Sequence, residues 1–376
     1  MNEGKKPKIL LISDYSNFHA TLAKGLRKYG CDVTLVSDGG SFMKCDRDID
    51  ISRRFKGKAG GLLHAANLRF SVWPRLKGYD IVSFRDPQFL ELRPERIEWF
   101  FRHIVNSNTS CFLSYLSTDV RYLDMLEAPD SPLRYSEWFV DGEPNRLLRQ
   151  EGWRWDAWHS SRMKKLNDLF YSMIKGAVTA LYEYHCSARR NFPENKIAYG
   201  GIPIDLDSIQ PQIFDRPKKI RLFIARDNRR KLEKGNDFLE TAARNVVSKY
   251  PDKAELVVME NVTRARYMEM MRSCHVLLDQ IYSYTPATMA LEAMASGLTA
   301  ITGAEQAFYD FIGEKNNFPI INAPHELEPL EKCIESVVLH SDRLREASIR
   351  GREFVTKHNS MELVAGRFLN FWQKNG

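Results

Sequence analysis

The sequence predicts an α/β protein with two doubly wound, Rossmann-like domains that face a cleft. Short apolar runs of strand length alternate with segments of helical periodicity, which is the pattern of βαβ units and a parallel sheet. This alternation breaks at residues 203–208 and restarts at residues 219–225. At 376 residues the chain also exceeds the length at which a single core stops growing. We therefore expect an amino-terminal domain over residues 1–202 and a carboxyl-terminal domain over residues 203–376, with the last helix crossing back to the first domain.

The first expected domain opens with a βαβ unit. KILLIS (residues 8–13) has strand length, residues 20–29 have helical periodicity that ends before Gly30, and residues 31–37 form a second apolar run. A right-handed crossover between parallel strands follows from this order. Further strands are expected at residues 80–84, 110–115 and 177–181.

The second expected domain repeats the same alternation. Strands are predicted at residues 219–225, 255–259, 274–278, 298–302 and 318–322. Helices are predicted at residues 236–249, 264–272, 286–296, 327–340 and 361–374. In such a sheet a ligand binds outside the carboxyl ends of the strands.

The segment DQIYSYTPATMALEAMASG (residues 279–297) is the most informative part of the chain. Thr285 is a candidate N-cap and Pro286 fits the first helical position, so we expect a helix to start there, directly after a buried strand. The free N–H groups of such a helix start bind anions. Glu292 follows Thr288 by one turn, which puts both on one helix face. The alternative is an ordinary strand-loop-helix unit whose glutamate is solvated.

A basic loop, RDNRRKLEKG, precedes the helix expected at residues 236–249. Arg226 directly follows a strand, and Lys234 with Gly235 opens the helix. Two cations at a strand end and a helix start suit a pyrophosphate, because charge-assisted hydrogen bonds are the strong ones. The alternative is a solvated loop, and this is how we interpret residues 229–231.

Taken together, R-x7-K-G and ALEAMASG followed by a strand and a glycine resemble the carboxyl-terminal domain of GT-B glycosyltransferases of the family 4 type. The resemblance spans about residues 220–338. It implies that the positions of Arg226 and Lys234 neutralise the donor diphosphate and that the position of Glu292 binds the ribose. The segment 277–297 is similar to the variant found in bacterial surface-polysaccharide transferases.

The sequence departs from that family at two sites. Tyr284 stands where the first of two glutamates is expected, so Tyr284, Thr285, Ala287 and Thr288 become candidates for donor contact. LSTDVR (residues 116–121) resembles the family's HG-S/T-D segment, but Leu116 replaces the histidine. Asp119 remains, either facing the cleft or serving only as a helix cap.

His19 follows the first strand and is the only histidine at a strand-helix junction of the first domain. We take His19 and Asp119 as the catalytic candidates, with a purely structural histidine as the alternative. The expected chemistry needs fixed positive charge at the leaving diphosphate. No metal site is expected, since none of the D-x-D pairs follows a convincing strand, and no cofactor is expected beyond the nucleotide sugar as co-substrate.

The net charge of +7 and the pI near 9.0 indicate acidic partners. Residues 44–77 carry nine Lys or Arg against three Asp, interleaved with aromatic side chains, and this suits an anionic membrane surface or a lipid-diphosphate acceptor. Nucleic-acid motifs are lacking, so nucleic acid is not an expected partner. The six scattered cysteines fit free thiols, and no apolar run is long enough for a membrane span.

The function expected from the resemblance is glycosyl transfer from a nucleotide-diphosphate sugar to a glycan or lipid-linked acceptor during surface-polysaccharide synthesis. Retention of anomeric configuration is implied, and the expected location is cytoplasmic, including the inner face of the cell membrane. One alternative is a catalytically silent nucleotide-sugar sensor or scaffold. The other is a sugar-nucleotide epimerase, which would need acid and base carboxylates that the sequence does not place.

Overall fold

The computed structural model describes residues 6–40, 43–226 and 228–376. By its contacts the chain divides into two compact units. Unit 1 comprises residues 1–130, 152–203 and 361–376, and unit 2 comprises residues 131–151 and 204–360. Residues 131–151, which lie within the range expected for the first domain, therefore group with the second unit.

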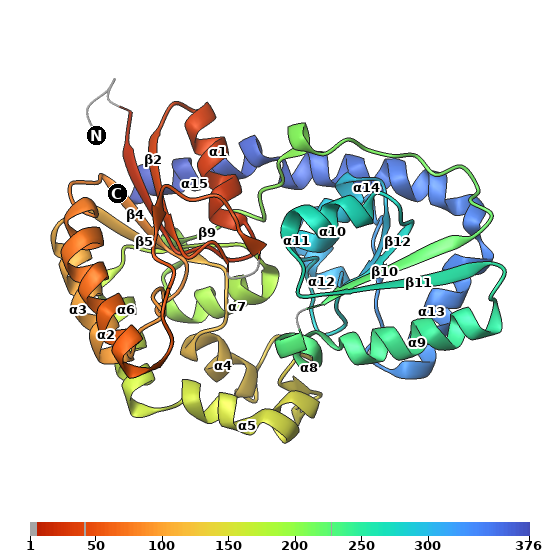
Figure 1. The fold of residues 1–376 in the computed structure, drawn as a ribbon, viewed down its shortest axis with the longest axis horizontal. Coiled ribbons are helices and arrows are strands. Elements are labelled where there is room, and N and C mark those ends of the chain that lie inside the picture. Colours follow the sequence, from red (N-terminus) through yellow and green to blue (C-terminus); the bar gives the residue numbers. More distant parts are fainter. Residues whose placement is uncertain (1–5, 41–42, 227) are drawn as a thin grey trace. The chain divides into compact units, whose positions relative to one another are not determined.

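Unit 1 is built on a parallel sheet (Figure 1). In the described residues its strand order is β3-β2-β1-β4-β5-β8-β9, with bounds β1 Lys8–Ile12, β2 Asp32–Ser37, β3 Ile49–Asp50, β4 Ile81–Phe84, β5 Ser110–Tyr115, β8 Ala177–Thr179 and β9 Ile197–Tyr199. Its helices are α1 Phe18–Lys28, α2 Gly57–Asn67, α3 Pro94–Asn106, α4 Val120–Glu127, α6 Ser161–Met173, α7 Tyr182–Asn191 and α15 Met361–Asn375. A π-helical turn, η2 Leu68–Val72, and a 3-10 turn, η3 Trp73–Arg75, continue α2.

Aromatic side chains on both faces of this sheet fix the helix layers. Phe84 of β4 pairs in register with Leu113 of β5, so Phe84 and Phe112 point to opposite faces. Phe84 packs against Phe101 of α3 and Phe170 of α6, whereas Phe112 packs against side chains of α15. Helix α15 also packs along α1, so both faces of the sheet are covered.

Unit 2 contains the second parallel sheet, of order β11-β10-β12-β13-β14 in the part of the chain that the structure describes. The strands are β10 Ile220–Arg226, β11 Ala254–Glu260, β12 Val276–Leu278, β13 Thr299–Thr302 and β14 Ile321–Asn322. The helices are α8 Lys231–Lys234, α9 Asn236–Lys249, α10 Arg264–Met271, α11 Thr288–Ala295, α12 Gln306–Ile312, α13 Leu327–Leu339 and α14 Leu344–Asn359. Helix α9 packs against α13, and α11 packs against α14, on the two sides of the sheet (Figure 1).

The segment 131–151 of unit 2 carries a short antiparallel hairpin, β6 Phe139–Val140 and β7 Glu143–Pro144, and leads into α5 Arg146–Trp158. Trp138 of this segment is buried, as a core residue would be. None of the helices in the described ranges combines the length and the apolar composition that a bilayer crossing needs.

The predicted N-cap and start of the helix after β12 needed correction. The helix expected from Pro286 begins at Thr288, with Ala287 at the cap position and no side-chain cap bond there. The residues before it stay irregular because the loop is tied to the next strand: the Glu305 N–H donates to the Tyr284 carbonyl at 3.1 Å. Gly303 allows this approach, since a Cβ on it would lie 1.8 Å from the Ser283 carbonyl oxygen.

Candidate functional site

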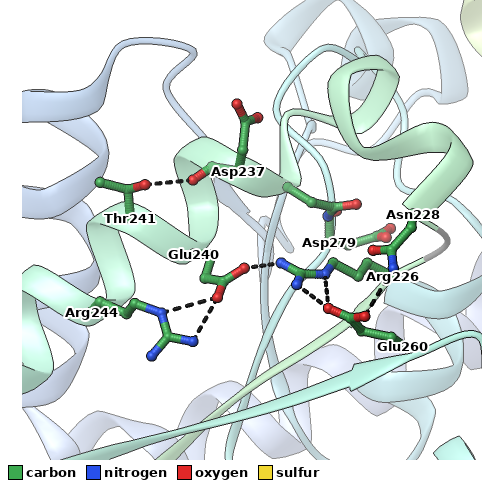
Figure 2. Close-up of polar contacts among 9 residues, drawn as sticks. Arg226, Asn228, Asp237, Glu240, Thr241, Arg244, Glu260 and Asp279 are labelled. Atoms are coloured by element: carbon green, nitrogen blue, oxygen red, sulfur yellow. Dashed lines mark hydrogen bonds and ion pairs between the residues drawn. The ribbon is translucent and has the colours of Figure 1, made fainter.

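The candidate donor site lies at the carboxyl ends of the strands of unit 2. Arg226 ends β10, Glu260 ends the neighbouring β11, and Asp279 follows β12, which pairs with β10 on its other side. Because parallel strands end at the same edge, the topology alone brings these side chains together. Figure 2 shows Arg226 and Asp279 at this edge.

Arg226 is held between two carboxylates. Its Nε donates to Glu260 Oε1 at 2.8 Å, and its guanidinium also pairs with Glu240 of α9 (Figure 2). Glu240 is shared further with Arg244, one turn along the helix, at 2.6 Å. Hydrogen bonds from Asn228 and Arg226 lower the pKa of Glu260, so this carboxylate stays ionised. Arg226, which the sequence predicts to bind phosphate, is therefore already paired with two carboxylates in this conformation.

Lys234 lies at the same edge through a buried ion pair. Its Nζ is 2.7 Å from Asp279 Oδ1, and the Asp279 side chain is fully buried. Asp279 Oδ2 has no hydrogen-bond partner among the described residues. Asn236, which follows Gly235 and begins α9, donates to the Asp279 carbonyl at 2.9 Å. The aspartate thus fixes the lysine and retains one buried acceptor.

Gly235 is required where it stands. It adopts φ +68° between α8 and α9, and a Cβ there would lie 2.4 Å from Ile281 Cγ1. The Ile281 N–H donates to the Lys234 carbonyl at 3.1 Å. The basic loop and the loop after β12 are therefore held together by a backbone hydrogen bond and by the close packing of Gly235 against Ile281.

Glu292 is buried on α11 and bonded to α10. Arg264 Nε donates to its Oε1 at 3.1 Å, and the Tyr267 hydroxyl bonds its Oε2. Arg264 is the first residue of α10, which follows β11, so the glutamate reaches toward the same edge as Arg226. A carboxylate has about four acceptor positions, so Glu292 retains capacity for hydroxyl donors. Sequence reasoning missed Arg264, because a partner 28 residues away leaves no local signal.

The residues expected to contact a donor sugar divide into two groups. Ala287 and Thr288 are half-buried at the start of α11. Thr285 is 2% exposed, and the Tyr284 hydroxyl accepts the Arg134 N–H at 2.7 Å while its ring packs on Tyr135. In this conformation Tyr284 therefore binds residues 131–151 of its own unit, which the sequence did not indicate.

In unit 1, the two catalytic candidates follow the carboxyl ends of strands: His19 follows β1 and Asp119 follows β5. His19, in the first turn of α1, is fully buried, and its Nδ1 is 2.5 Å from the Ser13 carbonyl. Burial lowers the pKa of His19 to about 4, so it is neutral at pH 7. Its Nε2 has no hydrogen-bond partner within the described ranges. A neutral imidazole with a free nitrogen can accept a proton or a hydrogen bond.

Asp119 has a structural role in this conformation. It is the N-cap of α4 and accepts the Tyr122 N–H at 2.9 Å. The Tyr115 and Tyr171 hydroxyls donate to its two oxygens, each at 2.6 Å. Burial raises the pKa of Asp119 to about 6. Of the two readings that the sequence left open, the geometry matches the helix cap.

The structure adds Asp86 to this edge. Asp86 follows β4, between β1 and β5, and its Oδ2 accepts from Arg85 Nε and Ser117 Oγ, each at 2.6 Å. It is 3% exposed, and its Oδ1 has no partner among the residues described. The signal was present in the sequence, as an RDP turn directly after a predicted strand.

Asp14 shapes the loop that holds His19. Its carboxylate accepts the N–H groups of Tyr15 at 2.7 Å and His19 at 2.8 Å, which anchors the start of α1. Burial raises the pKa of Asp14 to about 6, against the lowering effect of these bonds. Ser13 adopts φ +65°, a left-handed conformation that a serine rarely takes.

Two parallel sheets of this order, each covered by helices, define the fold of the GT-B glycosyltransferases, and comparison with solved structures agrees. The chain is similar over 98% of its length to 99% of sucrose-phosphate synthase from Thermosynechococcus elongatus, with a TM-score of 0.63 and 13% identity. It is similar over 98% of its length to all of HepE from Anabaena, solved with UDP and glucose, with a TM-score of 0.60 and 9% identity.

A third similar structure is WaaG, a glycosyltransferase involved in lipopolysaccharide biosynthesis. The match covers 96% of this chain and 97% of WaaG, with a TM-score of 0.55 and 12% identity. No protein-family model matches the sequence. No curated protein matches it either. At these identities the likeness establishes the fold.

Proposed function

We propose that the protein is a glycosyltransferase that moves a sugar from a nucleotide-diphosphate donor to a glycan or lipid-linked acceptor in surface-polysaccharide synthesis. The observation that carries the proposal is the clustering of Arg226, Lys234 and Glu292 at one sheet edge of a GT-B fold. HepE, which shares the fold, was solved with UDP and glucose, so a UDP-hexose is the first donor to test.

In the proposed reaction the bond between the sugar C1 and the diphosphate oxygen breaks, and its electron pair leaves with the diphosphate. The acceptor oxygen bonds C1, and its proton passes to a phosphate oxygen or to solvent. Arg226 and Lys234 would bind the diphosphate as charge grows on it, which stabilises the transition state more than the ground state. We propose retention of configuration, and no metal or cofactor takes part.

For a diphosphate to bind, Arg226 and Lys234 must exchange their carboxylate partners for phosphate oxygens. Arg226 is bonded to Glu240 and Glu260, and Lys234 to Asp279, so a diphosphate must share or displace those carboxylates. Glu260 is the most exposed of the three, with a side-chain exposure of 41%, and we propose that it yields first. Glu292 would accept ribose hydroxyls while Arg264 holds it in place.

In unit 1 we propose that His19 and Asp86 receive the acceptor hydroxyl. Both side chains are buried, and each keeps one polar atom without a protein partner among the described residues. Asp119 stays in the proposal only as the group that fixes the start of α4. We place the reaction in the cytoplasm, at the inner face of the cell membrane.

The same ion pairs favour a second candidate, a silent nucleotide-sugar sensor, because compensated cations neutralise a leaving group less well. Titration calorimetry with UDP, GDP, ADP and their sugars tests the binding that both candidates share. We expect one nucleotide series to bind, with affinity lost in a Lys234→Met/Asp279→Asn variant. The double change avoids leaving a buried carboxylate unpaired, which by itself costs about 3–5 kcal/mol. No binding by any nucleotide would overturn both candidates.

A further inference from the structure

The positive charge of the chain is concentrated in one segment of unit 1. Residues 51–79 contain seven Lys or Arg and no Asp or Glu. These seven cations equal the formal net charge of +7, and the remaining residues carry 48 basic against 48 acidic side chains. An excess confined to one segment indicates a dedicated surface for an anionic partner.

The same segment exposes large apolar side chains. Phe55, Leu62, Leu63 and Phe70 have exposed fractions of 62%, 63%, 60% and 74%. Leu63 and Phe70 are seven residues apart along α2 and η2, and Leu62 is adjacent to Leu63, so the three share one helical face. Phe55 precedes α2 by two residues. We call these four residues the apolar stripe.

Cations border the apolar stripe. Arg54, Lys56, Lys58 and Arg69 are all exposed. Within the part of the chain that the structure describes, Arg54, Lys56 and Lys58 form no ion pair. Arg69 lies over the Trp99 ring at 4.5 Å, which fixes its stem against α3. Lysine and arginine stems lie along apolar surface while their charged ends stay in the polar layer, as at a membrane interface.

Two hollows lie between α2 and α3. A groove of about 510 Å³ is lined by Leu62, Ala66, Phe70 and Trp99, with Arg69 and Arg96 at its sides. A second hollow of about 670 Å³ is lined by Arg53, Lys58, Arg93 and Arg96. Arg96 lines both hollows, so the apolar groove and the basic hollow are neighbours. The acyl chain and the phosphate of a phospholipid are neighbours in the same way.

Acidic side chains near this surface are few and engaged. Glu91 lines the basic hollow and lies 3.5 Å from Arg53. Glu95 lines the apolar groove and lies 3.0 Å from Arg162 of α6. Because both glutamates are paired elsewhere, the exposed cations Arg54, Lys56 and Lys58 are not neutralised by them.

We propose that α2, η2 and the residues leading into them bind the surface of an anionic phospholipid bilayer. Phe55, Leu62, Leu63 and Phe70 enter the interface, and Arg54, Lys56, Lys58 and Arg69 contact the lipid phosphates. Exposed apolar groups bordered by cations match both parts of such a surface, whereas a polyanion alone offers nothing to the apolar stripe. This deepens the peripheral location proposed above, and binding to vesicles requires no sugar transfer, so the two proposals fail separately.

Cosedimentation of the full chain with large unilamellar vesicles tests the proposal. We expect binding to phosphatidylcholine vesicles that contain about 30% phosphatidylglycerol, and at least tenfold weaker binding to phosphatidylcholine alone, with affinity falling as salt rises. An Arg54→Gln/Lys56→Gln/Lys58→Gln variant should lose about tenfold or more. A Leu62→Ser/Leu63→Ser/Phe70→Ser variant should lose as much.

Matched controls separate this surface from general effects of charge and hydrophobicity. Arg216→Gln/Lys218→Gln/Lys219→Gln removes three exposed cations of unit 2, and Ile213→Ser/Phe318→Ser removes exposed apolar groups there. Both controls should bind vesicles as the wild type does. The proposal is overturned if controls and α2 variants lose binding equally, if the wild type binds neutral and anionic vesicles alike, or if it binds heparin but neither kind of vesicle.

Discussion

At the scale of single residues, the candidate donor site is a set of cations already paired with carboxylates. Arg226 lies between Glu240 and Glu260, and Lys234 is paired with the buried Asp279. These pairs keep the cations in place and oppose phosphate binding at the same time. In the proposed function, nucleotide affinity depends on how easily each carboxylate is displaced, and the most exposed one should be displaced first.

Glu260→Gln should therefore raise affinity for a nucleoside diphosphate. The substitution removes a charge that competes for Arg226 and keeps an oxygen that can accept from Asn228. Exposed ion pairs are weak, so we expect only a small gain in affinity, up to roughly fivefold. Titration calorimetry measures it, with Glu335→Gln as the control, since Glu335 pairs with Lys249 away from the site. Weaker binding in Glu260→Gln would mean that Glu260 positions Arg226 for the ligand.

His19 should make the protein sensitive to acid. Its native pKa of about 4 lies below the usual 6.5, so the unfolded state binds more protons between these values and stability rises with pH across that window. Lowering the pH from 6.5 to 4 should cost the wild type roughly 2–3 kcal/mol more than His19→Gln, whose amide can still donate to Ser13. Urea unfolding at several pH values measures this difference. Parallel pH curves for the two proteins would contradict a buried neutral histidine.

At the scale of elements, the loop between β12 and α11 is shaped by tertiary contact. Gly303, after β13, lets the Ser283 carbonyl approach it, and this tie sets where α11 begins. The loop in turn presents Tyr284 to residues 131–151. Helix α11 then carries Glu292 to Arg264 at the first turn of α10.

Gly303→Ala should destabilise unit 2 by roughly 1–3 kcal/mol, because the added methyl would meet a backbone oxygen that cannot move freely. Gly152→Ala is the control: it lies in α5, a Cβ there meets nothing within 4 Å, and alanine should leave stability equal or up to about 1 kcal/mol higher. Thermal unfolding compares the two. Equal melting temperatures would show that the loop tolerates displacement from Gly303.

Most strands of the two sheets could be predicted, because β-branched runs bounded by turn residues carry a local signal. The short strands β3 Ile49–Asp50 and β9 Ile197–Tyr199 were missed. Residues 110–115 and 236–249 have the predicted bounds. The placement of Arg226, Lys234 and Glu292 could be predicted too, since each stands at a fixed position relative to a strand or helix, and their roles in donor binding stay predictions. The start of α11 could not, because proline preference at Pro286 is weaker than the contact at Gly303. The pairing of Tyr284 with Arg134, 150 residues away, leaves no trace in sequence spacing.

At the scale of the whole molecule, a GT-B fold carries compensated cations in unit 2, a buried histidine in unit 1, and an excess of positive charge on one surface segment. Sequence identities of 9–13% with the similar structures mean that the fold persists where most side chains differ. The proposed activity therefore has to be argued from this chain's own residues. The two candidate functions, transferase and sensor, predict different behaviour for the candidate donor site.

Release of nucleotide from a nucleotide sugar, measured with and without acceptor glycans, tests the proposed transfer most directly. The donor is the one that binds in calorimetry, and the comparison is wild type against the Lys234→Met/Asp279→Asn variant, checked for folding by thermal unfolding. We expect turnover by the wild type that acceptor increases, and a loss of at least a hundredfold in the variant, since one of the two cations proposed to stabilise the leaving diphosphate is then missing. Tight donor binding by the wild type with no release across the acceptor panel would contradict the transferase and identify a sensor.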